Sequence, residues 1–288
     1  MGLTWGSRSG RTQLMTTTLR PTEPLQQEAD GTRSRRYQVC VNSRPVGAIH
    51  LGTSALFGDA VAQIRDLSIE EPDRRRGRGT VAALAAEEVA RSWGCGRIEA
   101  SVPAEAETAL RMATNLGYVV RNRHMEKPLG GTAPELPAGS RSRPMTQEEY
   151  GPWLARGTEE FILDWTERGV PEAEARTKAL QGNAEMLPDG FATADMLFSV
   201  LEHEGTRVGT LWTGPRDGKA FVYDVEADAR HRGKGHGRTL MLLAEAQGVA
   251  AGLPTIRLNV FAGNTPAERL YESLGYETVT YHLYKSLL

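Results

Sequence analysis

Hydrophobic positions in the second half of the chain follow two spacings, and each spacing predicts one kind of element. A spacing of two residues, or a short apolar run between turn residues, is typical of strands. This pattern occurs in four segments: Phe198–Glu202, Val208–Thr213, Ala220–Glu226 and Ile256–Val260. In the third segment we expect Phe221, Tyr223 and Val225 to share one face of the strand.

Apolar residues three or four positions apart predict helices between these strands. Residues 237–251 form one such segment, with an inward face of Leu240, Leu243, Ala244 and Val249. Further helical patterns cover Gln147–Gly169, Pro171–Leu187 and 265–274, and Tyr281–Lys285 is a closing strand. The predicted order is βααβββαβαβ, which is an α/β fold with a mixed sheet covered by helices.

The second half of the chain repeats the first. At one offset Ile98–Leu129 matches Ile256–Leu287, with identities that include Leu-Gly-Tyr at 116–118 and 274–276. An offset two residues shorter places Arg74–Gly79 on Arg230–Gly235. Residues 128–144 lie between the halves and hold four prolines and three glycines, a composition typical of linkers. We predict two copies of one fold, at 15–129 and 144–288, joined by a linker at 130–143.

Composition and charge exclude several classes of protein. The formal net charge is −2, no apolar run reaches the roughly 20 residues of a membrane span, and two cysteines cannot form a disulfide framework. We expect a soluble, cytoplasmic protein that contacts neither membrane nor nucleic acid. Arg74–Arg78 has a rival interpretation as a nucleic-acid patch, and we interpret Arg33–Arg36 as a solvated turn. Whether residues 1–14 belong to the folded protein is open, because Met15 is an alternative start.

A glycine-rich loop, Arg232-Gly233-Lys234-Gly235-His236-Gly237, lies between a predicted strand and a predicted helix. Glycines allow the backbone to approach an anion closely, and a helix start presents unpaired N–H groups to it. Local positive charge comes from Arg230, Arg232, Lys234 and Arg238. The loop has neither the Gly-Lys-Ser/Thr of a Walker motif nor the spacing of a dinucleotide fold. The pattern therefore favours a phosphate site of another kind.

Two motifs resemble those of the GNAT superfamily of acetyltransferases. The segment Val225–Gly237 resembles its motif A, Arg/Gln-x-x-Gly-x-Gly/Ala after a strand. The segment Asn264–Tyr276 resembles its motif B, Asn-x-x-Ala-x-x-Leu-Tyr-x-x-Leu-Gly-Phe/Tyr. The resemblance covers about 140–288 fully and 15–129 in part. It implies two tandem GNAT folds, each a mixed, mostly antiparallel sheet splayed at a central bulge and flanked by helices.

The resemblance also implies a reaction and a set of roles. The reaction is transfer of an acetyl group from acetyl-CoA, without a metal, to a primary amine of a small molecule or peptide, in a ternary complex. Loop amides of 232–237 would surround the pyrophosphate, the strand end Val225-Glu226-Ala227 would pair with pantetheine, and Asn264 would touch the CoA arm. Tyr271 would bind near the sulfur and protonate the leaving thiolate, since its phenol has an ordinary pKa of about 10. The protein would be a monomer or homodimer.

Each of these residues also has a purely structural interpretation. Tyr271 could be a core aromatic of an amphipathic helix, and Asn264 could serve only as an N-cap. Lys234 and Arg238 could lie on a solvated face. Gly275 and Tyr276 are expected to end the helix and pack in the core.

The first copy lacks counterparts of the proposed catalytic residues. With the shorter offset in the loop, Val81 replaces the final glycine of motif A, and its branched side chain would crowd a phosphate. Ala106 corresponds to Asn264, and Ala113 corresponds to Tyr271. We therefore predict that the first copy is inactive, that the chemistry lies in the second copy, and that one CoA binds per chain.

The general base and the acceptor stay open at this stage. Asp224 and Glu226 flank the active strand on the face opposite Val225, Glu202 and His203 end a neighbouring strand, and a water chain is equally consistent with the sequence. Acidic and aromatic residues of 147–187 would suit a cationic amine. Alternative functions are a mycothiol-synthase-like acetyltransferase, which also pairs a dead and a live copy, a non-catalytic acyl-CoA sensor or scaffold, and a protein-modifying enzyme whose first half docks the target.

Overall fold

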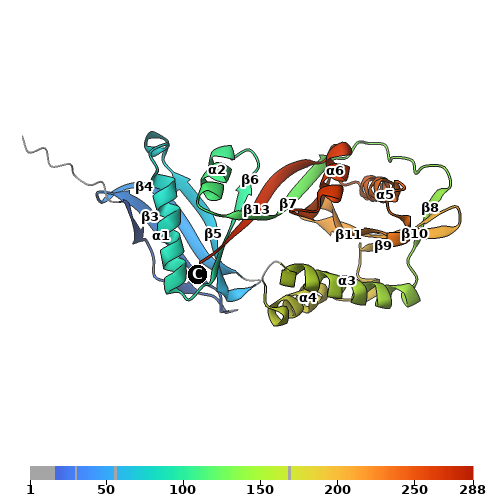
Figure 1. Ribbon diagram of the computed structural model, residues 1–288, viewed down its shortest axis with the longest axis horizontal. Coiled ribbons are helices and arrows are strands. Elements are labelled where there is room, and N and C mark those ends of the chain that lie inside the picture. Colours follow the sequence, from blue (N-terminus) through green and yellow to red (C-terminus); the bar gives the residue numbers. More distant parts are fainter. Residues whose placement is uncertain (1–16, 30, 55–56, 168–169, 288) are drawn as a thin grey trace, which may run out of the picture. The chain divides into compact units, whose positions relative to one another are not determined.

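A computed structural model describes residues 17–287 except 30, 55–56 and 168–169 (Figure 1). Residues 1–14 and Met15 therefore lie outside the described part of the chain. The chain forms two compact units, one up to Ala100 with 285–288 and the other from Ser101 to Tyr284. No described helix combines the length and the apolar character that a membrane crossing needs.

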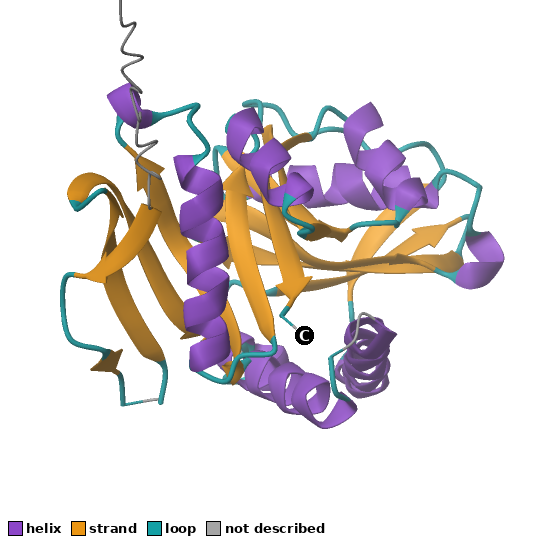
Figure 2. Cartoon of the chain, turned by 60° about the vertical axis from the view of Figure 1, so that its left-hand side comes forward, coloured by secondary structure: helices purple, strands orange, loops and turns teal. Residues whose placement is uncertain are grey.

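The first unit is a sheet with a long helix packed on it. Its strands are β1 (Thr17–Pro21), β2 (Gln26–Gln27), β3 (Arg33–Val41), β4 (Arg44–Ser54), β5 (Gly58–Ile69) and the start of β6 (Arg97–Pro103). Neighbours pair in the order β1-β3-β4-β5-β6, antiparallel except for β5 with β6. Helix α1 (Arg78–Ser92) packs on this sheet (Figure 2). Its buried residues include Ala82, Ala83, Ala86 and Ala90.

The interpretation of Arg33–Arg36 as a solvated turn is wrong. These residues begin β3, where they pair with β4. Ser34 is buried, and Arg33 makes an ion pair with Asp59 at 3.2 Å. Alternation explains the error, because a strand with one exposed face places charged residues next to buried ones.

The second unit holds a longer sheet with helices on both faces. Its elements are α2 (Glu107–Asn115), β7 (Val119–Pro128), β8 (Ser140–Pro144), α3 (Gln147–Glu167), α4 (Glu172–Met186), β9 (Leu197–His203), β10 (Thr206–Arg216), β11 (Lys219–Ala227), α5 (His236–Ala250), β12 (Thr255–Phe261), α6 (Thr265–Ser273) and β13 (Glu277–Ser286). The strand order is β13-β7-β12-β11-β10-β9-β8, with β11 and β12 parallel. The predicted order βααβββαβαβ and the mixed, mostly antiparallel sheet are confirmed.

Strand β7 belongs to the first copy of the repeat but lies inside the sheet of the second unit. It pairs antiparallel with β12 on one side and with β13 on the other, and Figure 1 shows the green β7 beside the red β13. The predicted domains, 15–129 and 144–288, follow the sequence repeat. The compact units instead divide at Ala100, so that α2 and β7 join the elements of the second copy.

The two copies correspond at a single offset from the glycine-rich loop to the last strand. Helices α1 and α5 begin after Gly77 and Gly235, and both glycines have a left-handed backbone, with φ of 73° and 87°. The three-residue turns before them, Glu71–Asp73 and Ala229–His231, match at the same offset. The offset two residues shorter is therefore wrong for the loop. Gly79, not Val81, is the counterpart of Gly237.

Two hydrophobic clusters lie on opposite faces of the second sheet. One packs α5 and α6 against the strands and contains Leu240, Leu258 and Tyr271. The other packs α3 against the opposite face and contains Trp153 and Trp212. Of the predicted inward residues, Leu240, Leu243 and Ala244 are buried, whereas Val249 is only partly buried.

A β-bulge at Tyr223 changes the face to which β11 side chains point. In the pairing with β10, consecutive residues of β10 face Val222 and Asp224, so Tyr223 is the extra residue. As a result Val222 and Val225 both pack on the cluster of α5, whereas Tyr223 packs on the cluster of α3. The expected shared face is confirmed for Phe221 and Tyr223, whose ring centroids lie 4.8 Å apart. It is wrong for Val225, because the bulge interrupts the period of two.

Candidate functional site

The site that the sequence predicts lies where strands β11 and β12 stop pairing. Their parallel pairing covers only Ala220–Val222 with Ile256–Leu258. Strand β11 continues to Ala227 along β10, while β12 continues to Phe261 along β7. The two strands therefore part after the bulge, and the edge of Tyr223–Ala227 that faced β12 is left without a strand partner in the described chain. Backbone N–H and C=O groups on such an edge are available to a ligand.

The glycine-rich loop connects the free end of β11 to the start of α5. Gly233 and Gly235 have φ of 76° and 87°, a left-handed conformation that glycine adopts without steric cost. A Cβ atom built at either position meets nothing within 4 Å, so the space beside both residues is open. Gly235 is the N-cap of α5 and has no side chain to accept from the first amides. The helix thus presents unpaired N–H groups and its positive dipole end to this space.

The basic residues of the loop divide into two groups. Arg230 and Lys234 are exposed. Arg232 donates to the carbonyl of Ala227 at 3.3 Å, and Arg238 donates to Ser273 of α6 at 2.6 Å. Arg238 therefore connects α5 to α6, a role that its exposure alone would not indicate.

Two predicted members of the loop have structural side-chain roles. The ring of His236 is buried and lies 5.2 Å from that of His203 and 6.2 Å from that of His231. Burial, and then the neighbouring histidines and Lys234, lower the pKa of His236, which favours its neutral form. A Cβ at Gly237 would lie 3.2 Å from Leu270 of α6. Gly237 thus permits close packing of two helices, and only the backbone of His236 remains a candidate for ligand contact.

Helix α6 supplies the two candidate residues of motif B. Asn264 caps the helix, and its side chain accepts from the amide of Ala267 at 3.4 Å, while the residue itself is exposed. Tyr271 is buried with 7% of its surface exposed, in the same cluster as Leu240 and Leu258. Capping and core packing are thus both present. Neither excludes ligand contact, because Asn264 is accessible and the phenol of a core tyrosine can face a cleft.

Asp224 carries the strongest electrostatic perturbation on the free part of β11. Burial raises the pKa of this carboxyl to about 6, with further contributions from the nearby charges of Glu226 and Glu160. Burial also raises the pKa of Tyr271 to about 12, and the negative charge of Asp224 adds to that shift. The charge of Asp224 therefore contributes to the pKa of the phenol. At neutral pH Asp224 is mostly ionised, whereas Tyr271 retains its proton.

The other candidate bases are held in ion pairs or hydrogen bonds. Glu226 accepts from Arg156 of α3 at 2.8 Å. Glu202 accepts from Arg141 at 2.8 Å and from Arg143 at 2.9 Å, and these hydrogen bonds lower its pKa. Because the charged form of Glu202 is stabilised in this way, it is a weak base. Among the carboxylates proposed from the sequence, Asp224 alone combines a raised pKa with a position on the free edge.

Aromatic side chains line the α3 side of the same region. Trp212, which faces Asp224 across β10 and β11, stacks on Tyr223 with ring centroids 4.6 Å apart. Trp153 of α3 packs on Trp212 at 5.9 Å. A half-buried carboxylate next to aromatic faces is an arrangement that can receive a cationic group. The described residues contain no group of three or more His, Cys, Asp or Glu side chains arranged to bind a metal.

The loop of the first copy has a different electrostatic arrangement. Arg75 has a φ of 57° where the second copy has Gly233. Arg78, the counterpart of His236, is buried and forms an ion pair with the buried Asp73. Arg44 donates to both carboxylate oxygens of Asp73, at 2.8 and 2.9 Å. At the corrected offset, Gly77 and Gly79 correspond to Gly235 and Gly237. The glycine pattern of motif A is thus present in the first copy, and the argument that Val81 blocks it is wrong.

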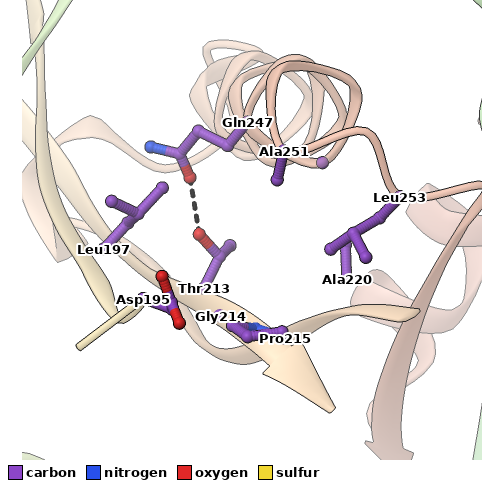
Figure 3. A pocket seen from close by; sticks show the side chains of 10 residues that line it. Asp195, Leu197, Thr213, Gly214, Pro215, Ala220, Gln247, Ala251 and Leu253 are labelled. Atoms are coloured by element: carbon purple, nitrogen blue, oxygen red, sulfur yellow. Dashed lines mark hydrogen bonds between the residues drawn. The ribbon is translucent and has the colours of Figure 1, made fainter. Parts of the chain in front are cut away.

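A separate cavity of about 360 Å³ lies at the hairpin end of β10 and β11 (Figure 3). Gln247 of α5 accepts from Thr213 at 2.6 Å inside it and donates to Ser199 at 2.8 Å. Its lining, taken from the described part of the chain, includes none of the site residues predicted from the sequence. The cavity is thus distinct from the candidate site.

Comparison with known proteins agrees with the two motifs. A sequence model of the acetyltransferase (GNAT) family matches residues 11–118 and 157–276. The mycothiol acetyltransferase of Thermobispora bispora is 32% identical over 267 residues, which cover 86% of this chain and 88% of that protein. The uncharacterized N-acetyltransferase YycN of Bacillus subtilis is 28% identical over 151 residues, 50% of this chain and 96% of that protein.

A solved structure agrees at the level of the fold. The GCN5-related N-acetyltransferase from Sphaerobacter thermophilus has a TM-score of 0.56 at 19% identity, and the match covers 88% of this chain and 80% of that one. The resemblance drawn from motifs A and B is thereby confirmed, for both copies of the repeat. The chain belongs to the GNAT family of acetyltransferases.

Proposed function

We propose that this protein is an acetyl-CoA-dependent N-acetyltransferase that acts on a primary amine, with its chemistry in the second copy. The observation that carries the proposal is the free edge of β11, which continues into the open glycine-rich loop. Asp224 lies on that strand, and its negative charge contributes to the raised pKa of Tyr271 on α6. The first copy has Ala113 in place of Tyr271, and Ala106 in place of Asn264. Ala106 makes no side-chain cap on α2, so the first copy lacks both of the polar side chains that motif B would supply to the site.

The residues of the second copy fit a CoA molecule. The open space beside Gly233 and Gly235, the uncapped start of α5 and the exposed Arg230 and Lys234 suit a pyrophosphate. The free backbone edge at Val225–Ala227 suits the amides of pantetheine. Asn264 at the start of α6 is accessible to the same ligand. When bound, acetyl-CoA would supply the acetyl group as a thioester.

The side chains would then divide the proton transfers between them. Asp224, with a pKa of about 6, would accept a proton from the ammonium form of the acceptor and leave a nucleophilic amine. As the N–C bond forms and the C–S bond breaks, Tyr271, protonated at neutral pH, would donate a proton to the leaving thiolate and would regain one from the proton that the acetylated nitrogen releases. The pKa of Tyr271 is about 12, which is higher than the ordinary tyrosine pKa of about 10 that the sequence analysis assumed. An amide near Val225 would stabilise the charge that develops on the carbonyl oxygen.

Acetyl-CoA consumption measured with a panel of amines tests the proposal. Tyr271→Phe should lower kcat by about a hundredfold or more, which is typical of losing a general acid. Tyr284→Phe on β13 is the matched control and should retain activity. Full activity of the Tyr271 variant would overturn the assignment of the acid. Binding of acetyl-CoA without turnover of any amine would instead support the sensor alternative.

A second candidate function has support from a relative. A mycothiol acetyltransferase matches this chain over most of both lengths, which favours the unacetylated precursor of mycothiol as the acceptor. The measurement is kcat/KM for that precursor against simple primary amines. A preference of about a hundredfold for the precursor would support this acceptor, since such a ratio corresponds to nearly 3 kcal/mol of differential binding. Equal values would exclude it.

A further inference from the structure

Strand β7 ties the first copy of the repeat to the site in the second copy. Three of its side chains make ion pairs with elements of the second copy. Glu126 accepts from Lys219 of β11 and from Arg257 of β12, both at 2.6 Å. Lys127 donates to both oxygens of Glu245 on α5, at 2.8 Å each. The third residue is Arg123, and its partners lie on the helix that carries Tyr271.

Arg123 contacts α6 at two carboxylates one helical turn apart. Its guanidinium lies 2.9 Å from Glu272 and 3.6 Å from Glu268, and it donates to Thr278 of β13 at 3.1 Å. Its side chain is 16% exposed, so water screens these contacts only in part. Tyr271 lies between the two glutamates in sequence. A rigid cation that contacts both carboxylates fixes α6 against β7 in position and in rotation.

The first copy has no equivalent of this contact. At the offset that aligns the two copies, Tyr281 corresponds to Arg123, and Leu110 and Thr114 of α2 correspond to Glu268 and Glu272. The residues that form the contact are thus absent from the copy that also lacks the tyrosine. This asymmetry links the contact to the site, because a contact needed only for folding would be useful to both copies.

From the geometry we infer that Arg123 is a positioning residue for Tyr271, supplied by the first copy of the repeat to the active site of the second. The inference rests on the proposed function. Arg238 holds the other side of α6 through Ser273, so the helix is fixed between α5 and β7. A displacement of α6 by about 1 Å without Arg123 would move the phenol out of reach, an error that costs up to about a hundredfold in rate.

Steady-state kinetics of single and double variants test the inference. Arg123→Ala should lower kcat roughly 10- to 100-fold with little change in KM for acetyl-CoA, and Arg123→Lys should recover part of the loss. The double variant Arg123→Ala/Tyr271→Phe should be no slower than Tyr271→Phe alone, because Arg123 acts through Tyr271. Arg269→Ala, on the exposed face of the same helix, is the control and should match the wild type.

Thermal unfolding of each variant separates positioning from folding. If Arg123→Ala loses activity only in proportion to lost folded protein, or if the double variant shows the product of both losses, the inference is overturned. If Tyr271→Phe retains activity, the proposed acid fails first. If Tyr271→Phe is inactive and Arg123→Ala is fully active, the proposed function stands and the positioning role is excluded.

Discussion

Replacing Asp224 with asparagine should lower activity and raise stability at the same time. Burial raises the pKa of this carboxyl from 3.8 to about 6, mainly because the charged form loses solvation. A shift of about 2 units corresponds to roughly 3 kcal/mol, since each unit is worth about 1.4 kcal/mol. The folded state therefore carries this cost at neutral pH, where Asp224 is ionised.

The sign of the pH dependence follows from the direction of this shift. Below pH 3.8 the carboxyl is protonated in both the folded and the unfolded state, and it contributes no penalty. As the pH rises towards 6, the unfolded state releases the proton first, so the contribution of Asp224 to stability falls. Asp224→Asn should therefore raise the unfolding temperature at pH 7 by roughly 5–10 °C, and by much less at pH 4.

The activity of the wild type should fall on the acid side with an apparent pKa near 6. Glu226→Gln removes the second-largest cause of the shift and should move this acid limb to lower pH, with the same acceptor used throughout. Asp217→Asn, in the exposed turn between β10 and β11, is the control for both measurements. An acid limb near pH 4, or an Asp224→Asn variant that is active but no more stable, would refute the reasoning.

Two further predictions concern the loop and the strand from the first copy. Gly235→Ala should destabilise the protein by about 1–2 kcal/mol, because φ is 87° there and the new Cβ meets no atom that could compensate or clash; a thermal unfolding midpoint equal to that of the wild type would contradict this. Lys127→Met should cost roughly 2–4 kcal/mol in urea unfolding, because it leaves the buried Glu245 without its cation. Restored stability in Lys127→Met/Glu245→Met is expected, and its absence would show that the ion pair is not the cause.

The sequence predicted the elements of the second copy because their signals are local. Hydrophobic spacing placed the helices and strands, and Gly275 and Asn264 marked the ends of α6. The repeat and both motifs are also patterns along the chain, so the family and the candidate loop followed from them. Motif B needed no tertiary information, since one short helix carries both Asn264 and Tyr271.

Local patterns failed where two strands determine a feature together. The bulge at Tyr223 exists only in the pairing of β10 with β11, and it places Val225 and Asp224 on faces that strict alternation would exchange. The left-handed N-caps Gly77 and Gly235 show which loop residues of the two copies correspond. In the sequence, the arginines repeated in both loops had suggested an offset two residues shorter.

The sequence by itself determined that this protein consists of two related copies, and that the second carries both motifs of the GNAT family. Only the tertiary structure decided that β7 of the first copy lies between β12 and β13, where Arg123 meets α6. It also identified Asp224 as the perturbed carboxylate. The physical reason is the same in both cases. Arg123 and Glu272 are far apart in the sequence, and so are Asp224 and the residues of α3, Glu160 among them, that contribute to its environment. No spacing along the chain records which of these residues meet.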